Sequence, residues 1–169
     1  MRFISGAIMK IHMADSLEDL VFIESVWFNP KVFRWINDDL TKEADMDFSK
    51  IVARGLFFLP VSDDGRKMGF FYFVPWNNVC WEVHSAILPE FRGKKAIEAS
   101  KLMAKWFFTT MPYASKIVTH VPTDNQKAYA YAIRTGFTKE GLNRKSILRN
   151  GNLVDQYLFG LCKEEVICQ

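Results

Sequence analysis

Residues 82–106 constrain the fold of this 169-residue chain more than any other stretch. They begin within a segment, residues 79–88 (V-C-W-E-V-H-S-A-I-L), in which polar residues alternate with apolar and β-branched ones. This pattern predicts a buried strand with one functional face. Pro89 ends the strand because proline has no backbone N–H to donate to a ladder. Apolar residues then recur at helical spacing from position 97 onward, which predicts a helix after a short basic turn.

The basic turn predicts a binding site for an anion. Unpaired N–H groups point outward at the start of a helix, where the helix dipole is also positive. Lysine and arginine side chains beside such amides suit phosphate groups. A solvated basic first turn is the alternative, but it explains the glycine of the turn less well. The residues concerned are Arg92, Gly93, Lys94 and Lys95.

Composition limits the classes of protein that remain. The length predicts a single domain, residues 1–169, with a sizeable core. Hydrophobic residues make up 49% of the chain and aromatic residues 15%, which excludes disorder. A net charge of +3 with scattered basic residues accommodates an anionic ligand and disfavours a nucleic-acid-binding module. No apolar run reaches the roughly 18 residues of a membrane span, and we see no signal peptide, so we expect a cytoplasmic protein without a membrane partner.

The cysteines give no sign of a metal site or a disulfide framework. Cys80, Cys162 and Cys168 are odd in number and lack the spacing of metal ligands. We therefore expect reduced cysteines in a cytosolic protein, and no bound metal.

The rest of the chain predicts the element order β, helices, β-β-β, α, β, α, β-β. Asp15 or Ser16 is expected to cap the first helix, and Pro30 to open the second. Asn150-Gly151 predicts a tight hairpin between the last two strands. This order indicates an α+β (mixed α/β) domain, in which helices flank a mixed, mostly antiparallel central sheet. The expected strands are residues 2–13, 56–61, 67–75, 79–88, 116–121, 137–148 and 153–161, and the later helices are residues 43–53 and 126–134, with Asp124 or Asn125 as the cap of the latter.

The turn I-L-P-E-F-R-G-K-K-A resembles the R/Q-x-x-G-x-G/A motif of the GCN5-related N-acetyltransferase (GNAT) superfamily. Lys95 and Ile97 stand where that motif has small residues. The resemblance implies a GNAT-like fold and backbone amides that hold the pyrophosphate of acetyl-CoA, with Lys94 adding charge. The residues implied to bind this cofactor are Ile87, Leu88, Arg92, Gly93, Lys94, Lys95, Ala96 and Asn125.

The segment N-Q-K-A-Y-A-Y-A-I-R-T-G-F-T-K-E-G-L-N-R, with the later N-G-N-L-V-D, resembles the branch that acetylates ribosomal-protein N-termini. The resemblance implies that Asn125 contacts the pantetheine region or caps its helix. Ala132 takes the position of the family's proton-donating tyrosine. We expect the nearby Tyr129 and Tyr131 to serve in packing.

Two polar residues on the central strand are the candidate catalysts. Glu82 and His84 are two positions apart, so their side chains share one face. A carboxylate and an imidazole there could remove a proton from an ammonium group, or they could simply form a satisfied polar pair. The resemblance implies that amides near Ile87 and Leu88 polarise the thioester carbonyl. His12 and His120 lack comparable neighbours, so we expect them to be structural or surface residues.

These features favour an acetyl-CoA-dependent N-acetyltransferase acting on an amine of a protein or small molecule. The alternative is a catalytically inactive relative, because E-V-H-S-A-I-L-P-E-F-R-G-K-K-A also resembles acetyltransferase-like proteins of tailed bacteriophages. Such a protein would serve in the virion or in head assembly, with a phage protein or a second copy of itself as partner. A surface patch of aromatic residues would favour this interface, and a groove leading to Glu82 would favour an acceptor site. The aromatic residues concerned are Trp27, Phe28, Phe33, Trp35 and Trp76.

Overall fold

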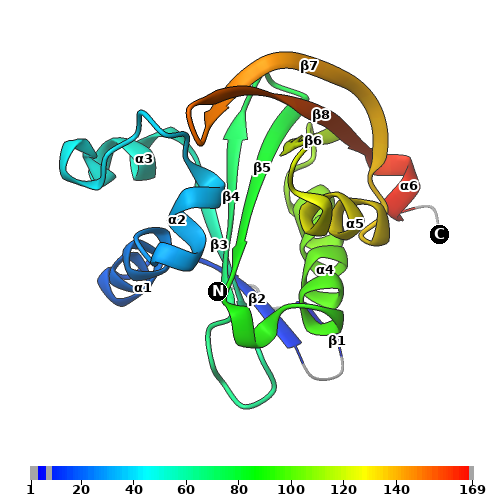
Figure 1. The fold of residues 1–169 in the computed structure, drawn as a ribbon. Coiled ribbons are helices and arrows are strands. Elements are labelled where there is room, and N and C mark those ends of the chain that lie inside the picture. Colours follow the sequence, from blue (N-terminus) through cyan, green and yellow to red (C-terminus); the bar gives the residue numbers. More distant parts are fainter. Residues whose placement is uncertain (1–3, 7–8, 168–169) are drawn as a thin grey trace.

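An eight-stranded sheet runs through the computed structural model, which describes residues 4–6 and 9–167 (Figure 1). The strand order is β1-β2-β3-β4-β5-β6-β8-β7. The pair β5–β6 is parallel and the other neighbouring pairs are antiparallel, which confirms the predicted mixed, mostly antiparallel sheet. The strands are β1 (Ile4–Gly6), β2 (Met9–Met13), β3 (Leu56–Val61), β4 (Gly69–Pro75), β5 (Cys80–Ile87), β6 (Lys116–Pro122), β7 (Thr138–Arg149) and β8 (Asn152–Cys162).

Helices cover both faces of this sheet. In Figure 1, α1, α2 and α3 lie on one side, and α4 and α5 lie on the other. None of the helices in the described ranges is long and apolar enough to cross a bilayer. The helices are α1 (Leu17–Trp27), α2 (Pro30–Ile36), η1 (Glu43–Asp45), α3 (Phe48–Arg54), η2 (Pro89–Phe91), α4 (Lys94–Thr110), α5 (Gln126–Arg134) and α6 (Lys163–Ile167).

The central strands are buried on both faces because each face carries a helical layer. Successive side chains of a strand point to opposite faces. Phe70 and Tyr72 of β4 therefore pack in the core beneath α1, α2 and α3. Phe71 and Phe73 of the same strand pack in the core that includes α4. An aromatic run such as F-F-Y-F is explained by this double burial.

Several helix boundaries follow from capping residues that the sequence predicts. The Ser16 hydroxyl accepts from the backbone N–H of Asp19 at 3.1 Å and starts α1. Pro30 occupies the first turn of α2. Asn150 and Gly151 both have positive φ, 50° and 73°, as the predicted tight hairpin requires.

Two expected elements are wrong in their bounds. The single strand predicted for residues 2–13 is a pair of antiparallel strands, β1 and β2; residues 2, 3, 7 and 8 of the prediction lie outside the described part of the chain. Gly6, which strands disfavour, ends the first of the pair. The helix predicted for residues 43–53 is the short η1 followed by α3, because the Asp47 side chain accepts from Ser49 N–H and starts α3 at Phe48. The final helix, α6, was not predicted.

The sheet opens between β5 and β6. β5 pairs with β4 from Trp81 to Ile87. With β6 it pairs only through Cys80, Trp81 and Glu82. Beyond Glu82 the two parallel strands separate, so residues 83–87 have no registered partner on β6. This gap positions the candidate site.

Candidate active site

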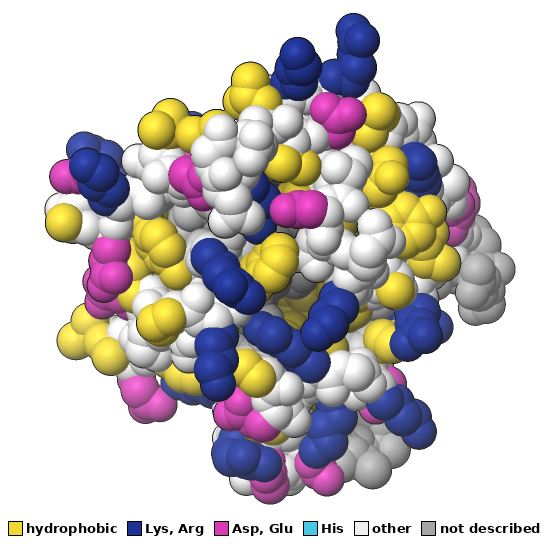
Figure 2. All heavy atoms as spheres, in the orientation of Figure 1, with side chains coloured by type: hydrophobic (Ala, Val, Ile, Leu, Met, Phe, Trp, Pro, Cys, Tyr) yellow, Lys and Arg dark blue, Asp and Glu magenta, His cyan; other side chains and the backbone are white. Residues whose placement is uncertain are grey.

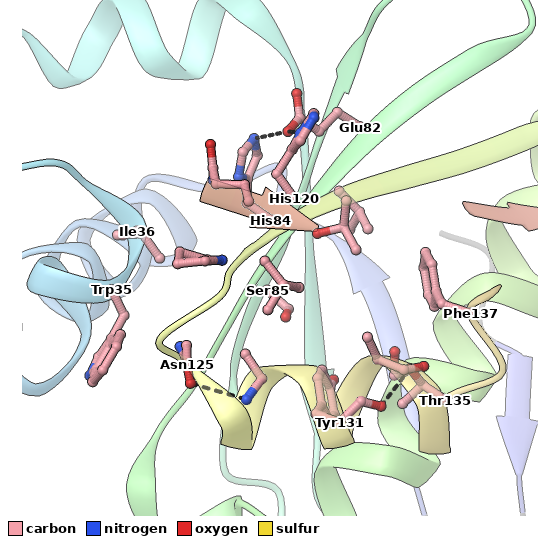
Figure 3. A pocket seen from close by; sticks show the side chains of 18 of the residues that line it. Trp35, Ile36, Glu82, His84, Ser85, His120, Asn125, Tyr131, Thr135 and Phe137 are labelled. Carbon is pink, nitrogen blue, oxygen red and sulfur yellow. Dashed lines mark hydrogen bonds and ion pairs between the residues drawn. The ribbon is translucent and has the colours of Figure 1, made fainter. Parts of the chain in front are cut away.

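A cavity of about 370 Å³ lies where β5 and β6 separate. Figure 3 shows side chains that line it from both helical layers and from the sheet. Trp35 and Ile36 come from α2, Ser85 from β5, His120 from β6 and Tyr131 from α5, and Thr135 caps the C-terminal end of α5. The cavity therefore joins the helical layer on one face of the sheet to the layer on the other.

Three titratable side chains meet at one end of this cavity (Figure 3). Glu82 and His84 share a face of β5, as their spacing predicts, and His120 of β6 lies beside them. Glu82 Oε1 is 2.9 Å from His120 Nδ1 and 3.8 Å from His84 Nε2. Trp76 donates its Nε1–H to Glu82 Oε2 at 3.0 Å. Both carboxylate oxygens of Glu82 thus have a hydrogen-bond partner.

The expectation that His120 lacks neighbours comparable to those of Glu82 and His84 is wrong, because His120 contacts Glu82 itself. Glu82 and His120 are 38 positions apart, and the three parallel residue pairs between β5 and β6 bring them together. No local pattern contains that pairing. The position of His120 along β6 could indicate that it shares a face of the sheet with Glu82 only if β5 and β6 were known to be neighbouring strands.

The surroundings of the cluster lower the pKa values of both Glu82 and His84, and so keep Glu82 ionised. Burial alone would raise the pKa of Glu82, but hydrogen bonds from His120 and Trp76, with the charge of His84, outweigh it and hold the pKa below its usual value. The Glu82 side chain is 18% exposed. Burial lowers the pKa of the His84 imidazole, although Glu82 opposes this effect.

The α5 side of the cavity carries hydroxyl and amide groups. The Asn125 side chain accepts from Ala128 N–H at 3.1 Å, so it caps α5 and lines the cavity. The Tyr131 hydroxyl donates to the Ala96 carbonyl at 3.3 Å and also lies beside Ser85 and Ser100. Burial raises its pKa, against the effect of the two serines.

The two tyrosines of α5 differ in their surroundings. Tyr129 packs edge-on against Tyr157 and Phe159, with ring centroids 5.3 and 5.4 Å apart. This is the packing role expected for it. Tyr131 instead lines the cavity, and Ala132 is buried next to it.

The start of α4 offers free backbone donors. Gly93 caps the helix with φ +83°, a conformation that favours glycine, and it has no side chain that could accept from the first turn. The N–H groups of Lys94, Lys95 and Ala96 are therefore available to a ligand. The ammonium groups of both lysines lie more than 3.5 Å from the nearest carboxylates, on Glu98 and Asp63, and are solvent-exposed. Lys and Arg side chains gather in this part of the face shown in Figure 2.

The other residues implied to contact the cofactor brace the loop. Arg92 Nε donates to the Ile87 carbonyl at 3.1 Å, which ties the loop to the end of β5. Leu88 N–H donates to the Met68 carbonyl at 2.9 Å. The amide of Leu88 is therefore already engaged, and a thioester carbonyl would require another donor.

The aromatic residues of the first helices do not form one surface patch. Trp27 is buried in the core, and Phe28 stacks on Phe33 with centroids 5.9 Å apart. Trp35 lines the cavity, and the half-exposed Trp76 holds Glu82. Two of the five aromatic residues therefore belong to the site.

Neither a metal site nor a disulfide is found in the part of the chain that the structure describes. No group of three or more His, Cys, Asp or Glu side chains there could hold a metal ion. Cys80 and Cys162 are free thiols, and Cys168 lies outside the described residues. Burial raises the pKa of both thiols, so both are protonated at neutral pH.

Solved structures show the same fold. The chain is similar to a spermidine N-acetyltransferase from Vibrio cholerae in complex with CoA and spermine, with TM-score 0.80, 19% identity, and 94% of this chain and 98% of that chain covered. It is similar to a GNAT-family acetyltransferase from Bacillus anthracis, with TM-score 0.77, 20% identity, and 96% and 99% covered. The ribosomal-protein-S5-alanine acetyltransferase from Vibrio fischeri gives TM-score 0.74, 15% identity, and 98% and 99% covered.

These likenesses, all at low identity, establish that the chain has the GNAT fold. No curated protein sequence matches it. One protein family matches residues 43–168, well over half of the chain, and that stretch includes every residue of the cluster around Glu82. The chain belongs to this family, described as "Protein of unknown function (DUF2824)".

Proposed function

We propose that this protein is an acetyl-CoA-dependent N-acetyltransferase that acts on an amine of a protein or small molecule. One observation carries the proposal. The cavity between β5 and β6 holds a carboxylate–histidine cluster, and Tyr131 of its wall donates to the Ala96 carbonyl in the first turn of α4, where the backbone amides are free. Acetyl transfer to an amine needs both, since phosphates must be held at one end and a proton removed at the other.

The cofactor side is formed by α4, β5 and α5. The first-turn amides of α4 and the nearby lysines suit the pyrophosphate. Residues 83–87 of β5 face the gap without a partner on β6, so their backbone groups can bind an extended ligand. Asn125 and Tyr131 line the opposite wall of the cavity.

The acceptor side is formed by α2 and the cluster around Glu82. Glu82 and His84 face the layer of α1, α2 and α3, and Trp35 and Ile36 cover the cavity there. An amine entering from this side meets the cluster first, and the cluster removes its ammonium proton. The structurally similar Vibrio cholerae enzyme is described in complex with CoA and spermine, which supports an amine acceptor.

Calorimetric titration with acetyl-CoA tests the proposal. We expect micromolar binding by the parent protein and at least a tenfold weaker affinity for the variant carrying Arg92→Ala and Lys94→Ala, because the variant loses loop bracing and charge at the phosphate end. Lys101→Ala with Lys105→Ala is the matched control. It removes two exposed positive charges from the same helix, away from its first turn.

Release of CoA thiol in the presence of an amine panel then tests catalysis. Spermine, an alanine-initiated peptide and a simple primary alkylamine cover polyvalent, peptide and small acceptors. Turnover with any of them, dependent on Glu82, supports the proposal. No binding and no thermal shift at millimolar acetyl-CoA would contradict it and favour the non-catalytic alternative, a protein-interaction or virion component.

A further inference from the structure

We propose that His120 is the general base of the acceptor site and that Glu82 and Trp76 are positioning residues that hold its imidazole in the required tautomer. The inference rests on the proposed acetyl transfer and assigns the proton-removing role within that site. It moves this role from the central strand β5 to a histidine on β6.

The tautomer follows from the charge state of Glu82. The hydrogen bonds and charges around Glu82 keep it ionised, and an ionised carboxylate can only accept. The 2.9 Å contact with His120 therefore requires the proton to be on His120 Nδ1. In the neutral imidazole the other nitrogen, Nε2, then carries the lone pair. His120 lines the cavity, so this basic nitrogen belongs to a residue that an amine in the cavity can contact.

Glu82 itself is poorly suited to take the proton. Its Oε1 accepts from His120 and its Oε2 accepts from the Trp76 indole at 3.0 Å. Protonation of either oxygen would weaken one of these bonds. The Trp76 ring also lies against the His120 ring, with centroids 5.8 Å apart, so one residue restrains both members of the pair.

His84 is the competing candidate. Its Nε2 is 3.8 Å from Glu82 Oε1, beyond hydrogen-bond distance, and its side chain is 40% exposed against 18% for His120. Nothing in this contact selects one tautomer of His84. An oriented imidazole is the better base because its lone pair is held in place before the acceptor binds.

The acceptor R–NH₃⁺ loses one proton to His120 Nε2, and the nitrogen lone pair forms the new C–N bond at the thioester carbonyl. The C–S bond breaks with its electron pair on sulfur, and a proton from the nitrogen reaches the sulfur through a donor in the cavity. The products are the acetamide, CoA thiol and one proton, which His120 releases to solvent.

Nitrogen NMR of the ring atoms tests the tautomer without any turnover. The protein has three histidines, so His12→Gln and His84→Gln variants assign the signals of His120. We expect His120 to be the Nδ1–H tautomer at pH 8 in the parent, and to shift toward Nε2–H in Glu82→Gln. An Nε2–H tautomer in the parent would overturn the proposal, whether or not acetyl-CoA is a substrate.

Turnover of the best acceptor in the panel tests the role. We expect His120→Gly to lower kcat about a hundredfold or more, and added imidazole to raise the kcat of this variant at least tenfold. Glu82→Gln should lose less than His120→Gly, and Trp76→Phe less again, with KM for acetyl-CoA nearly unchanged. A larger loss in Glu82→Gln, or imidazole rescue of His84→Gly but not of His120→Gly, would overturn the assignment. Inactivity of the parent toward every amine would instead count against the proposed function, while the NMR result still decides the tautomer.

Discussion

At the scale of single residues, the proposed acetyl transfer predicts that the Tyr131 hydroxyl gives a proton to the leaving thiolate. Its hydroxyl lies beside Ser85 and Ser100 at the cavity wall. Burial keeps the phenol protonated, since its pKa is raised. Tyr131 lies one position before Ala132, which occupies the position where the resemblance implies a proton-donating tyrosine.

We expect Tyr131→Phe to lower kcat about a hundredfold, because a general acid typically contributes at least that much. Steady-state release of CoA thiol measures the effect. Tyr129→Phe is the matched control, since its ring packs on Tyr157 and Phe159 away from the cavity lining. An equal loss of kcat in both variants would show that a disturbance of α5, and not the loss of the Tyr131 hydroxyl, lowers activity.

Asp19 is a second residue whose surroundings decide its behaviour. Its backbone N–H donates to the Ser16 hydroxyl at the start of α1, and its carboxylate lies 2.9 Å from Lys67 and 3.2 Å from His12. Burial alone would raise the pKa of Asp19, but these polar partners outweigh it and lower the pKa far below its usual value. The carboxylate is only 6% exposed.

Asp19→Asn should lower the free energy of unfolding by about 3 kcal/mol at pH 7, because it leaves Lys67 without its buried partner. The folded pKa is depressed, so the unfolded chain takes up the proton first as the pH falls. The stabilisation is therefore fully present above about pH 4 and is lost progressively as the pH falls from there towards the depressed folded pKa. Urea unfolding from pH 7 to pH 3 should show the parent and variant converging.

Glu18→Gln is the control for this prediction. Glu18 also contacts Lys67 at 2.9 Å, but its side chain is 87% exposed. An exposed pair contributes about 1 kcal/mol or less. A loss in Glu18→Gln as large as in Asp19→Asn would contradict the importance of burial.

The sequence predicts those residue roles that depend on neighbours along the chain. Ser16 and Asn125 cap helices as their positions suggest, and Glu82 and His84 share a face because their spacing is two. The contact of Glu82 with His120 and the hydrogen bond from Trp76 depend on which strands are neighbours and where a turn folds back. A single sequence does not show which strands pair, so it predicts neither the Glu82–His120 contact nor the Trp76 hydrogen bond.

At the scale of elements, the β7–β8 hairpin clamps the end of α2 over the cavity. Arg149 donates to the Trp35 carbonyl at 3.1 Å, and its guanidinium lies 4.8 Å from the Trp35 ring centre. Asp39 accepts from Gly151 N–H at 2.8 Å and donates its own N–H to Leu148. The wall of the acceptor side is thus held by residues more than 100 positions away.

Arg149→Met should loosen this wall while keeping most of the side-chain volume. We expect a loss of about 2 kcal/mol in the free energy of unfolding, since a charged hydrogen bond and a ring contact are removed. Hydrogen exchange should accelerate in α2 and leave α4 unchanged. Arg144→Met, on an exposed position of the same hairpin, should change neither.

The hairpin itself was predicted because Asn150-Gly151 is a local turn signal. Its contact with α2 was not, since Arg149 and Trp35 have no shared pattern in the chain. Likewise the broken helix at residues 43–54 depended on Asp47 acting as a cap, which the apolar spacing alone did not indicate.

At the scale of the whole molecule, two cores share one sheet. The core with Phe70 and Trp27 lies beneath α1, α2 and α3, and the core with Phe107 and Phe159 lies beneath α4 and α5. The order of strands and helices was enough to predict this layered class. The separation of β5 from β6 was not, because residues 83–87 remain as apolar and strand-like as the paired part of the same strand.

Three residue pairs join β5 to β6, and past Glu82 the two strands are separated by side chains and no longer paired. A ligand bound in that opening would contact both strands and so take the place of the missing strand pairing. Unfolding would then be coupled to ligand dissociation, so the apparent stability of the protein would rise with the ligand concentration. The opening of the sheet coincides with the proposed binding site, so we expect the ligand concentration also to determine how long the protein resists proteolysis.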